Sequence, residues 1–226
     1  MDEEAFNPDA RVERLRIGRG GMEVIRIDGV FLDPERVAAL GFAQSYSQDP
    51  GNLYPGFRAA LPGSLAVALR TWLVPILQRN IDRDTSFFSV VATASRDLLP
   101  IQSIPHYDST DPDLFAAVIY LCDGKFPGTA FYRHRRTGYE EITRENVNDY
   151  RLALNVDMRI HGAPEREYIS GDTQLFEVIF ANELKFNSAI VYPGRALHAA
   201  RVAKNFEPPK DQSEWRLTVT ALVHAE

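Results

Sequence analysis

The sequence predicts a mainly β protein with flanking α-helices, of the sandwich or jelly-roll type. From residue 86 onward, short apolar and β-branched segments alternate with turn residues, which is the pattern of an antiparallel β protein. Strands are expected at 86–95, 101–107, 115–122, 129–133, 173–180, 185–192, 197–202 and 216–224. An inserted helix at 143–154 and a loop at 161–172 are expected to interrupt them.

The segment before the β-rich part predicts an arm followed by a strand. Residues 1–21 mix acidic residues with several arginines and end in two glycines, so a loosely ordered arm is expected there. Residues 23–27 alternate as Glu-Val-Ile-Arg-Ile, which is typical of a strand. Because no repeat or linker divides the 226 residues, one domain is expected over 1–226, with its β core at about 86–226.

Two helices are expected between this strand and the β core. The first begins at Asp33, a capping residue, has Pro34 in its first turn and extends to about Ser45. The second covers 64–81, where apolar residues recur at helical spacing. Pro75 should kink this second helix.

Composition narrows the class of protein. The net charge is −6, with 25 Lys and Arg against 31 Asp and Glu, so no nucleic-acid partner is expected. The single cysteine, Cys122, excludes an intramolecular disulfide and favours a reducing cytoplasm. No apolar run approaches the ~18 residues of a membrane span, and no signal peptide is evident, so a cytoplasmic protein without a membrane partner is expected.

A histidine and a carboxylate lie two residues apart at His106 and Asp108. On a strand, side chains at this spacing project from one face, so both can hold one ion. The alternative is a surface pair at the end of a strand.

A third ligand would have to come from a distant strand, and His198 suits that role. It follows the tight-turn pair Pro193-Gly194 and has small neighbours that leave room for an ion. Two histidines and one carboxylate form the facial set of non-haem Fe(II) oxygenases. The alternative is a hydrogen-bonded histidine in the core.

The last predicted strand alternates between a polar and an apolar face. Arg216, Thr218 and Thr220 share the polar face, which either lies in water or lines a pocket. A guanidinium with a neighbouring hydroxyl suits the far carboxylate of a dicarboxylic cosubstrate. Arg201 competes for this role, but its odd offset from His198 turns it to the opposite face. Four basic residues or histidines at 133–136 can grip an anionic substrate, or form a solvated turn.

With these residues in view, the chain resembles the Fe(II)/2-oxoglutarate-dependent oxygenase superfamily, and specifically one of its uncharacterised bacterial families. The resemblance implies a double-stranded β-helix. The matching segments follow one another in order: 25–32 (Ile-Arg-Ile-Asp-Gly-Val-Phe-Leu), 104–108 (Ile-Pro-His-Tyr-Asp), 117–121 (Ala-Val-Ile-Tyr-Leu), 128–132 (Gly-Thr-Ala-Phe-Tyr), 186–193 with Leu197-His198, and 216–218 (Arg-Leu-Thr).

The resemblance implies a hydroxylase that uses Fe(II), with His106, Asp108 and His198 as metal ligands. Related halogenases lack the metal carboxylate, so Asp108 favours hydroxylation, with desaturation and cyclisation left open. Ascorbate is expected as a reductant. The expected substrate is a small molecule or a peptide, and its identity and the oligomeric state stay open.

The cosubstrate implied by the resemblance is 2-oxoglutarate, anchored by Arg216 with help from Thr218. Tyr120 lies on a strand where related enzymes place a tyrosine against 2-oxoglutarate; a core tyrosine is the alternative. One departure is that eighteen residues separate His198 from Arg216, more than is usual in the superfamily, because 205–212 looks like an inserted loop.

Two other functions remain open. One is a noncatalytic jelly-roll module that binds a sugar or a small acid, because a fold alone does not determine function. The other is a cupin-type metal dioxygenase that does not use 2-oxoglutarate. Arg216 is the residue that separates this second possibility from the oxygenase.

Overall fold

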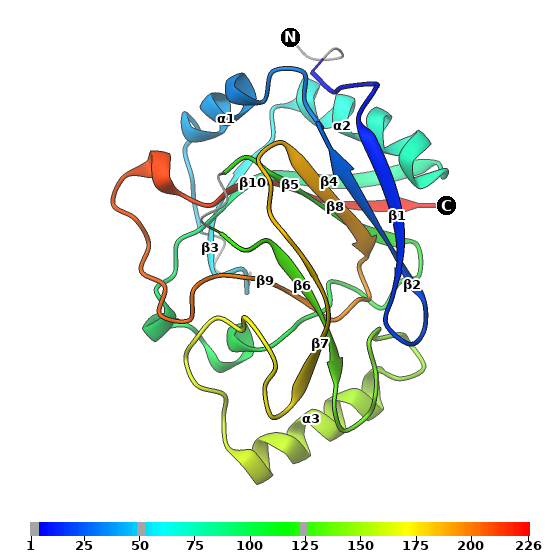
Figure 1. The fold of residues 1–226 in the computed structure, drawn as a ribbon, viewed down its shortest axis with the longest axis vertical. Helices are drawn as coiled ribbons and strands as arrows, with labels where there is room; N and C mark the ends of the chain where they lie inside the picture. Colours follow the sequence, from blue (N-terminus) through cyan, green and yellow to red (C-terminus); the bar gives the residue numbers. More distant parts are fainter. Residues whose placement is uncertain (1–4, 49–52, 123–125) are drawn as a thin grey trace.

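Two antiparallel sheets form the body of the protein in the computed structural model, which describes residues 5–48, 53–122 and 126–226 (Figure 1). The larger sheet has seven strands in the order β1-β2-β8-β5-β10-β4-β3, and the smaller has three in the order β7-β6-β9. The strands are β1 (Arg11–Ile17), β2 (Met22–Asp28), β3 (Gly56–Ala60), β4 (Ile81–Val91), β5 (Leu114–Tyr120), β6 (Thr129–His134), β7 (Phe176–Asn182), β8 (Ser188–Pro193), β9 (His198–Ala200) and β10 (Leu217–Ala225). The α-helices are α1 (Pro34–Phe42), α2 (Gly63–Leu77) and α3 (Val147–His161).

The path of the chain between the sheets is that of a double-stranded β-helix. From β4 onward the chain crosses repeatedly, with β4, β5, β8 and β10 in the large sheet and β6, β7 and β9 in the small one. His106 pairs with His198 of β9 and so adds a fourth row to the small sheet, between β4 and β5 in the chain. The predicted mainly β fold with flanking helices, a jelly roll, is therefore confirmed.

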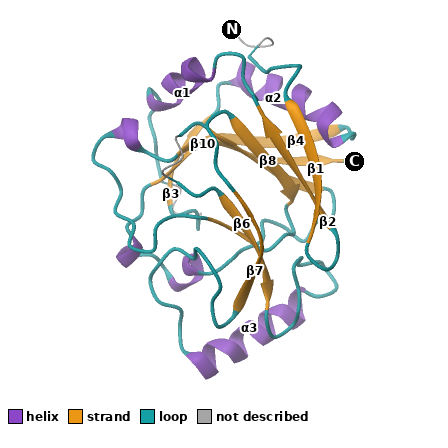
Figure 2. Cartoon of the chain, viewed as in Figure 1, coloured by secondary structure: helices purple, strands orange, loops and turns teal. Residues whose placement is uncertain are grey.

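The core is divided by the two faces of the large sheet. On the outer face, Val219 of β10 packs in one cluster with Leu69 of α2 and Val37 of α1. On the inner face, Tyr192 of β8 packs in one cluster with Phe131 of β6, so the two sheets share an apolar layer. Helix α3 packs on the small sheet. Figure 2 shows α1 and α2 at one end of the molecule and α3 at the other. Among the described residues, no helix is both long and apolar enough to cross a membrane.

The prediction of a loosely ordered arm over 1–21 is wrong for 11–17. This segment is β1, which pairs along its whole length with β2. It is an edge strand whose side chains are mostly exposed, so it lacks the apolar alternation that reveals a half-buried strand.

The predicted strand at 101–107 is also wrong. Pro100–Ser103 forms a short 3₁₀ helix, and pairing in this segment is confined to the bridge between His106 and His198. Pro100 and Pro105 lack an N–H group, so neither can donate to a sheet ladder.

The helix predictions hold with changed limits. The Asp33 carboxylate caps α1 by accepting a hydrogen bond from the Arg36 N–H at 3.0 Å. Helix α2 ends at Leu77 because Gln78 adopts a left-handed conformation with φ 56°, and β4 starts earlier than expected. Helix α3 begins later than the predicted 143–154 helix and continues to His161. The five-residue strand β3 was not predicted.

Candidate active site

The three predicted metal ligands, His106, Asp108 and His198, come together. Their donor atoms all lie within 4.8 Å of one another. The Asp108 Oδ2 atom is 3.7 Å from Nε2 of His198, and its Oδ1 atom is 4.0 Å from Nε2 of His106. One ion can therefore be reached by two imidazoles and one carboxylate.

Backbone hydrogen bonds hold these residues in register although the histidines are 92 positions apart in the sequence. The His106 N–H donates to the His198 carbonyl at 2.9 Å, and the His198 N–H donates back to the His106 carbonyl at 2.8 Å. The Asp108 N–H donates to the Gly194 carbonyl at 2.7 Å, so the turn between β8 and β9 positions the carboxylate. The site is thus built on paired backbone, which is a rigid support.

The tautomer of His198 follows from its neighbour. Its Nδ1 atom lies 2.9 Å from the Ala196 carbonyl oxygen, which can only accept, so Nδ1 carries the proton. The lone pair is then on Nε2, the atom that faces Asp108. An outer hydrogen bond of this kind orients a histidine for metal binding.

The charges of the two remaining ligands are affected by the surrounding protein. The His106 side chain is 56% exposed, yet it faces a cavity, and desolvation by the cavity walls followed by the charge of His198 lowers its pKa well below 6.5. Desolvation raises the pKa of Asp108 above 3.8, against the opposing effects of His198 and Arg58. Both shifts disfavour a charged side chain in the cavity without a partner of opposite charge.

The cavity beside these ligands has a volume of about 610 Å³, within the usual range of small-molecule sites. Its wall contains His106, Asp108 and His198 together with residues of β10. The polar face of β10 lies on this wall, whereas its apolar face packs against α1 and α2. The choice between a solvated and a pocket-lining polar face is thereby decided in favour of the pocket.

Arg216 is a buried arginine on this wall, only 3% exposed. Its Nη2 donates to the Gly128 carbonyl at 3.0 Å, and its guanidinium carbon lies 5.7 Å from the centre of the Tyr120 ring. Its Nε is buried and has no hydrogen-bond partner within the described parts of the chain. Thr218 is also on the wall, and its hydroxyl donates to the Ser89 carbonyl at 3.2 Å.

Arg201 and Tyr120, the other predicted candidates, do not line the cavity. Arg201 follows the end of β9, and its Nη1 donates to the Pro127 carbonyl at 3.3 Å. Tyr120 is fully buried, and its hydroxyl lies 2.7 Å from the hydroxyl of Thr129, which does line the cavity. Tyr120 therefore lies outside the cavity wall, where it contacts two residues that do line the cavity, Thr129 and Arg216.

Arg58 of β3 is a cavity residue that the sequence did not reveal. Its guanidinium carbon lies 4.5 Å from the centre of the Tyr54 ring and 5.3 Å from that of Phe87. An arginine in a short strand between turns has no periodic signal, so only the pairing of β3 with β4 brings it to the site.

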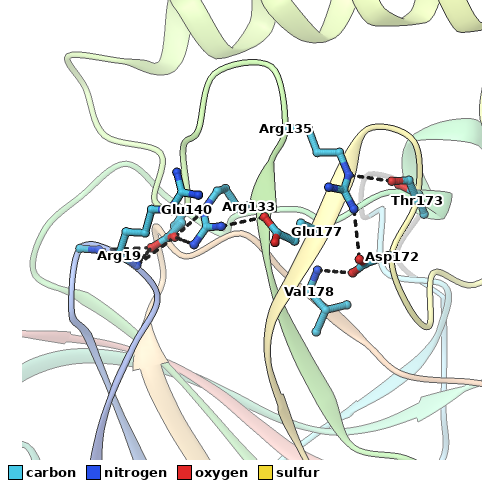
Figure 3. Close-up of polar contacts among 9 residues, drawn as sticks. Arg19, Arg133, Arg135, Glu140, Asp172, Thr173, Glu177 and Val178 are labelled. Carbon is cyan, nitrogen blue, oxygen red and sulfur yellow. Dashed lines mark hydrogen bonds and ion pairs between the residues drawn. The ribbon is translucent and has the colours of Figure 1, made fainter.

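The basic segment at 133–136 is not part of the cavity wall: Arg133 and His134 are buried on β6, and Arg135 and Arg136 lie in the exposed turn that follows. The Arg133 Nε donates to Glu140 at 2.7 Å, and its Nη1 donates to Glu177 at 2.7 Å (Figure 3). Glu140 also accepts from the Arg19 backbone N–H, at 3.0 Å and 3.1 Å from its two oxygens. These contacts join the turn after β1 to β6 and β7, so their role is structural.

His134 and Arg136, in the same segment, bind α3. The ring of His134, fully buried, has Nε2 3.0 Å from Oδ2 of Asp157, and the Arg136 Nε donates to the other Asp157 oxygen at 2.6 Å. Arg135 is bound to Asp172 (Figure 3). The side chains of this segment thus hold the small sheet and α3 together.

Several solved structures have a similar fold. A prolyl hydroxylase from Trichoplax adhaerens, in complex with a hypoxia inducible factor oxygen degradation domain peptide fragment, is 9% identical, covers 89% of this chain and 83% of its own, and has a TM-score of 0.49. A Pseudomonas putida prolyl-4-hydroxylase is 11% identical, with coverages of 92% and 95% and a TM-score of 0.46. HygX from Streptomyces hygroscopicus, with nickel and 2-oxoglutarate bound, is 14% identical, with coverages of 89% and 82% and a TM-score of 0.46.

These similarities assign no activity to this chain, because their identities are at most 14% and their TM-scores are below 0.5. No curated protein matches its sequence. The model of a family of unknown function, DUF6445, matches residues 8–223, and the chain therefore belongs to that family.

Proposed function

We propose that this protein is an Fe(II)- and 2-oxoglutarate-dependent dioxygenase that hydroxylates a small molecule or a peptide. One observation carries the proposal: His106, Asp108 and His198 converge on the wall of a cavity that also contains the buried Arg216. A metal and an anionic cosubstrate would thus meet in the same space.

The three side chains suit Fe(II). Two neutral imidazoles and one carboxylate are the donor set of non-haem Fe(II) oxygenases, which leaves positions open for other ligands. The bound metal would supply the oxygen chemistry that no side chain can provide. The protein contributes the Nε2 lone pair of His198, set by the Ala196 carbonyl, and the negative charge of Asp108.

Arg216 suits the far carboxylate of 2-oxoglutarate. Its Nε is desolvated without a partner, which is costly unless a ligand accepts from it. A carboxylate in the cavity would fill that need and neutralise the guanidinium charge. The Thr218 hydroxyl now donates to the Ser89 carbonyl, so it would have to rotate to donate to the same carboxylate.

Succinate production tests the proposal. With Fe(II), ascorbate as reductant, oxygen and 2-oxoglutarate, the wild type is expected to form succinate slowly even without a prime substrate. Asp108→Ala should reduce this rate by about a hundredfold or more, because the metal loses one ligand, while circular dichroism shows an unchanged fold. Asp97→Ala, which removes an exposed carboxylate that does not line the cavity, should keep the wild-type rate.

Two results would contradict the proposal. If the wild type forms no succinate across a broad panel of prime substrates and binds no metal, the noncatalytic binding module replaces it. If the protein binds metal but no 2-oxoglutarate, a cupin-type dioxygenase replaces it.

A further inference from the structure

The cavity wall contains a second arginine, Arg58, which has no role in the proposed metal and 2-oxoglutarate sites. Arg58 lies opposite Ser89 of β4, and Ser89 lies opposite Thr218 of β10. Directly opposed residues of antiparallel strands share a face, and neighbouring strands are about 4.8 Å apart. Arg58 is therefore on the same face as Thr218, two strands away from it.

Arg58 has aromatic rings beside its guanidinium group and an unpartnered Nε. Its guanidinium carbon lies over the rings of Tyr54 and Phe87, at 4.5 Å and 5.3 Å from their centres. The Nε atom is buried and has no hydrogen-bond partner among the described residues. The planar fork of N–H groups on a guanidinium matches a planar carboxylate.

A count of charges also points to an anion at Arg58. Asp108 is the sole acidic residue among the described residues of the cavity wall. With a divalent metal, Asp108, a dianionic cosubstrate and Arg216 in place, the formal charges of these four groups cancel. Arg58 then leaves one uncompensated positive charge on the cavity wall, which a negatively charged group would neutralise.

The rest of the wall is largely apolar. Aliphatic and aromatic side chains contribute most of it: Phe87, Val91, Ile101, Ile104, Val118 and Leu222. A ligand that reaches Arg58 would therefore lie against apolar side chains beside its charged group.

We propose that Arg58 binds a carboxylate of the prime substrate, and that this substrate is a carboxylic acid with an apolar body. The inference rests on the proposed function, because it gives Arg58 the substrate and Arg216 the cosubstrate. It also predicts that the two arginines are separable by mutation.

The main test measures binding of a probe acid to the loaded protein. The protein is loaded with Mn(II) and 2-oxoglutarate in the absence of oxygen. Phenylacetate and the neutral phenylacetamide are then titrated into it, and binding is followed by calorimetry and NMR. Arg58→Met should weaken phenylacetate about ten- to a hundredfold, while 2-oxoglutarate and Mn(II) affinities change less than about twofold. Phenylacetamide should bind the wild type at least about tenfold more weakly than phenylacetate does. Arg83→Met, which removes an arginine that is 73% exposed, is the matched control and should change nothing.

A second measurement makes the result independent of metal and of the chosen probe. The Nε–H resonance of Arg58, assigned by its loss in Arg58→Lys, is followed in metal-free protein during titration with acetate and with phenylacetate, against chloride at equal ionic strength. A shift with the carboxylates supports the inference. No shift with either acid overturns it.

The outcomes separate this inference from the proposed function. If Arg58→Met loses 2-oxoglutarate while Arg216→Met retains it, Arg58 is the cosubstrate anchor and the inference is overturned. If the wild type binds phenylacetate and phenylacetamide equally well, the inference also fails, with the oxygenase proposal intact. If no 2-oxoglutarate binds but Arg58 still responds to carboxylates, the oxygenase proposal fails and the anion site at Arg58 remains.

Discussion

Single hydrogen bonds decide what the cavity residues can do. The Ala196 carbonyl accepts from Nδ1 of His198 and so leaves Nε2 with its lone pair facing Asp108. Arg216 donates one of its N–H groups to Gly128 but has no partner for its buried Nε. In both residues, a protein contact orients the side chain and leaves one functional atom for a ligand.

The role of Arg216 can be tested against Arg201. Arg216→Met keeps much of the apolar volume of the side chain but removes the guanidinium, so 2-oxoglutarate binding to the Mn(II) protein should weaken about ten- to a hundredfold. Mn(II) affinity should be nearly unchanged. Arg201→Met should alter neither, since Arg201 does not line the cavity. Isothermal calorimetry of both variants measures this.

The result has a clear counter-outcome. Loss of 2-oxoglutarate binding in Arg201→Met alone would move the anchor to Arg201. Unchanged binding in both variants would remove the cosubstrate assignment from Arg216.

At the scale of the elements, ion pairs of Arg133 connect β6 to β7 and to the turn after β1. Arg133 on β6 binds Glu140 and Glu177, and Glu140 also accepts from the backbone after β1 (Figure 3). Burial alone would raise the pKa of Glu140, but the hydrogen bonds from Arg19 and Arg133 outweigh it and lower the pKa below 4.5. Gly18 permits this contact, because its φ is +67° and a Cβ there would lie 2.1 Å from a Glu140 oxygen.

The lowered pKa predicts a pH-dependent contribution to stability. A carboxyl group with a depressed folded pKa stabilises the protein above its unfolded pKa, and this contribution disappears as pH falls through the folded value. Glu140→Gln should therefore lower the free energy of unfolding by about 1.5–3 kcal/mol at pH 7, and by progressively less below about pH 4. Urea denaturation of the wild type and the variant at pH 7 and below about pH 4 measures the difference in the free energy of unfolding.

Glu177 provides the matched control for this experiment. It binds the same arginine, but its side chain is 39% exposed. Glu177→Gln should therefore cost less than about 1 kcal/mol. An equal loss in both variants, or a loss in Glu140→Gln that does not depend on pH, would contradict the assignment.

At the scale of the whole molecule, the candidate site lies between the two sheets. His198 belongs to the small sheet and His106 is paired with it, whereas Arg216 and Thr218 belong to the wall formed by the large sheet. A metal held by His106, Asp108 and His198 would bind the folded protein in preference to the unfolded chain, since the ligands are distant in sequence.

Metal binding should therefore raise the melting temperature. At a Mn(II) concentration about a hundredfold above the dissociation constant, linkage gives about 2.7 kcal/mol, which corresponds to roughly 5–10 °C for a chain of this size. His198→Ala should lose this increase. His224→Ala should retain the increase. This variant removes the histidine shared by two other clusters of potential metal ligands, both of which contain two carboxylates. Differential scanning fluorimetry decides, and an unchanged increase in His198→Ala would place the metal elsewhere.

Local pattern was sufficient to predict the fold class and most elements. The alternation of β10 and the capping residue Asp33 are properties of adjacent residues, so they are readable without the fold. Edge strand β1 and short strand β3 have no such pattern. They are strands because they pair with β2 and β4, and this pairing cannot be read from adjacent residues. Pro100 and Pro105 were a local signal against a strand at 101–107, and the structure has a 3₁₀ helix there.

By itself, the sequence determined which side chains could bind a metal or a carboxylate, since His106, Asp108, His198 and Arg216 are recognisable from spacing and residue type. Only the tertiary structure decided which of them share a cavity. It placed Arg216 on the wall and Arg201 off it, put Tyr120 behind Thr129, and added Arg58 from a strand with no pattern of its own. The physical reason is that pairing between strands, which sets these neighbours, depends on contacts between residues far apart in the chain.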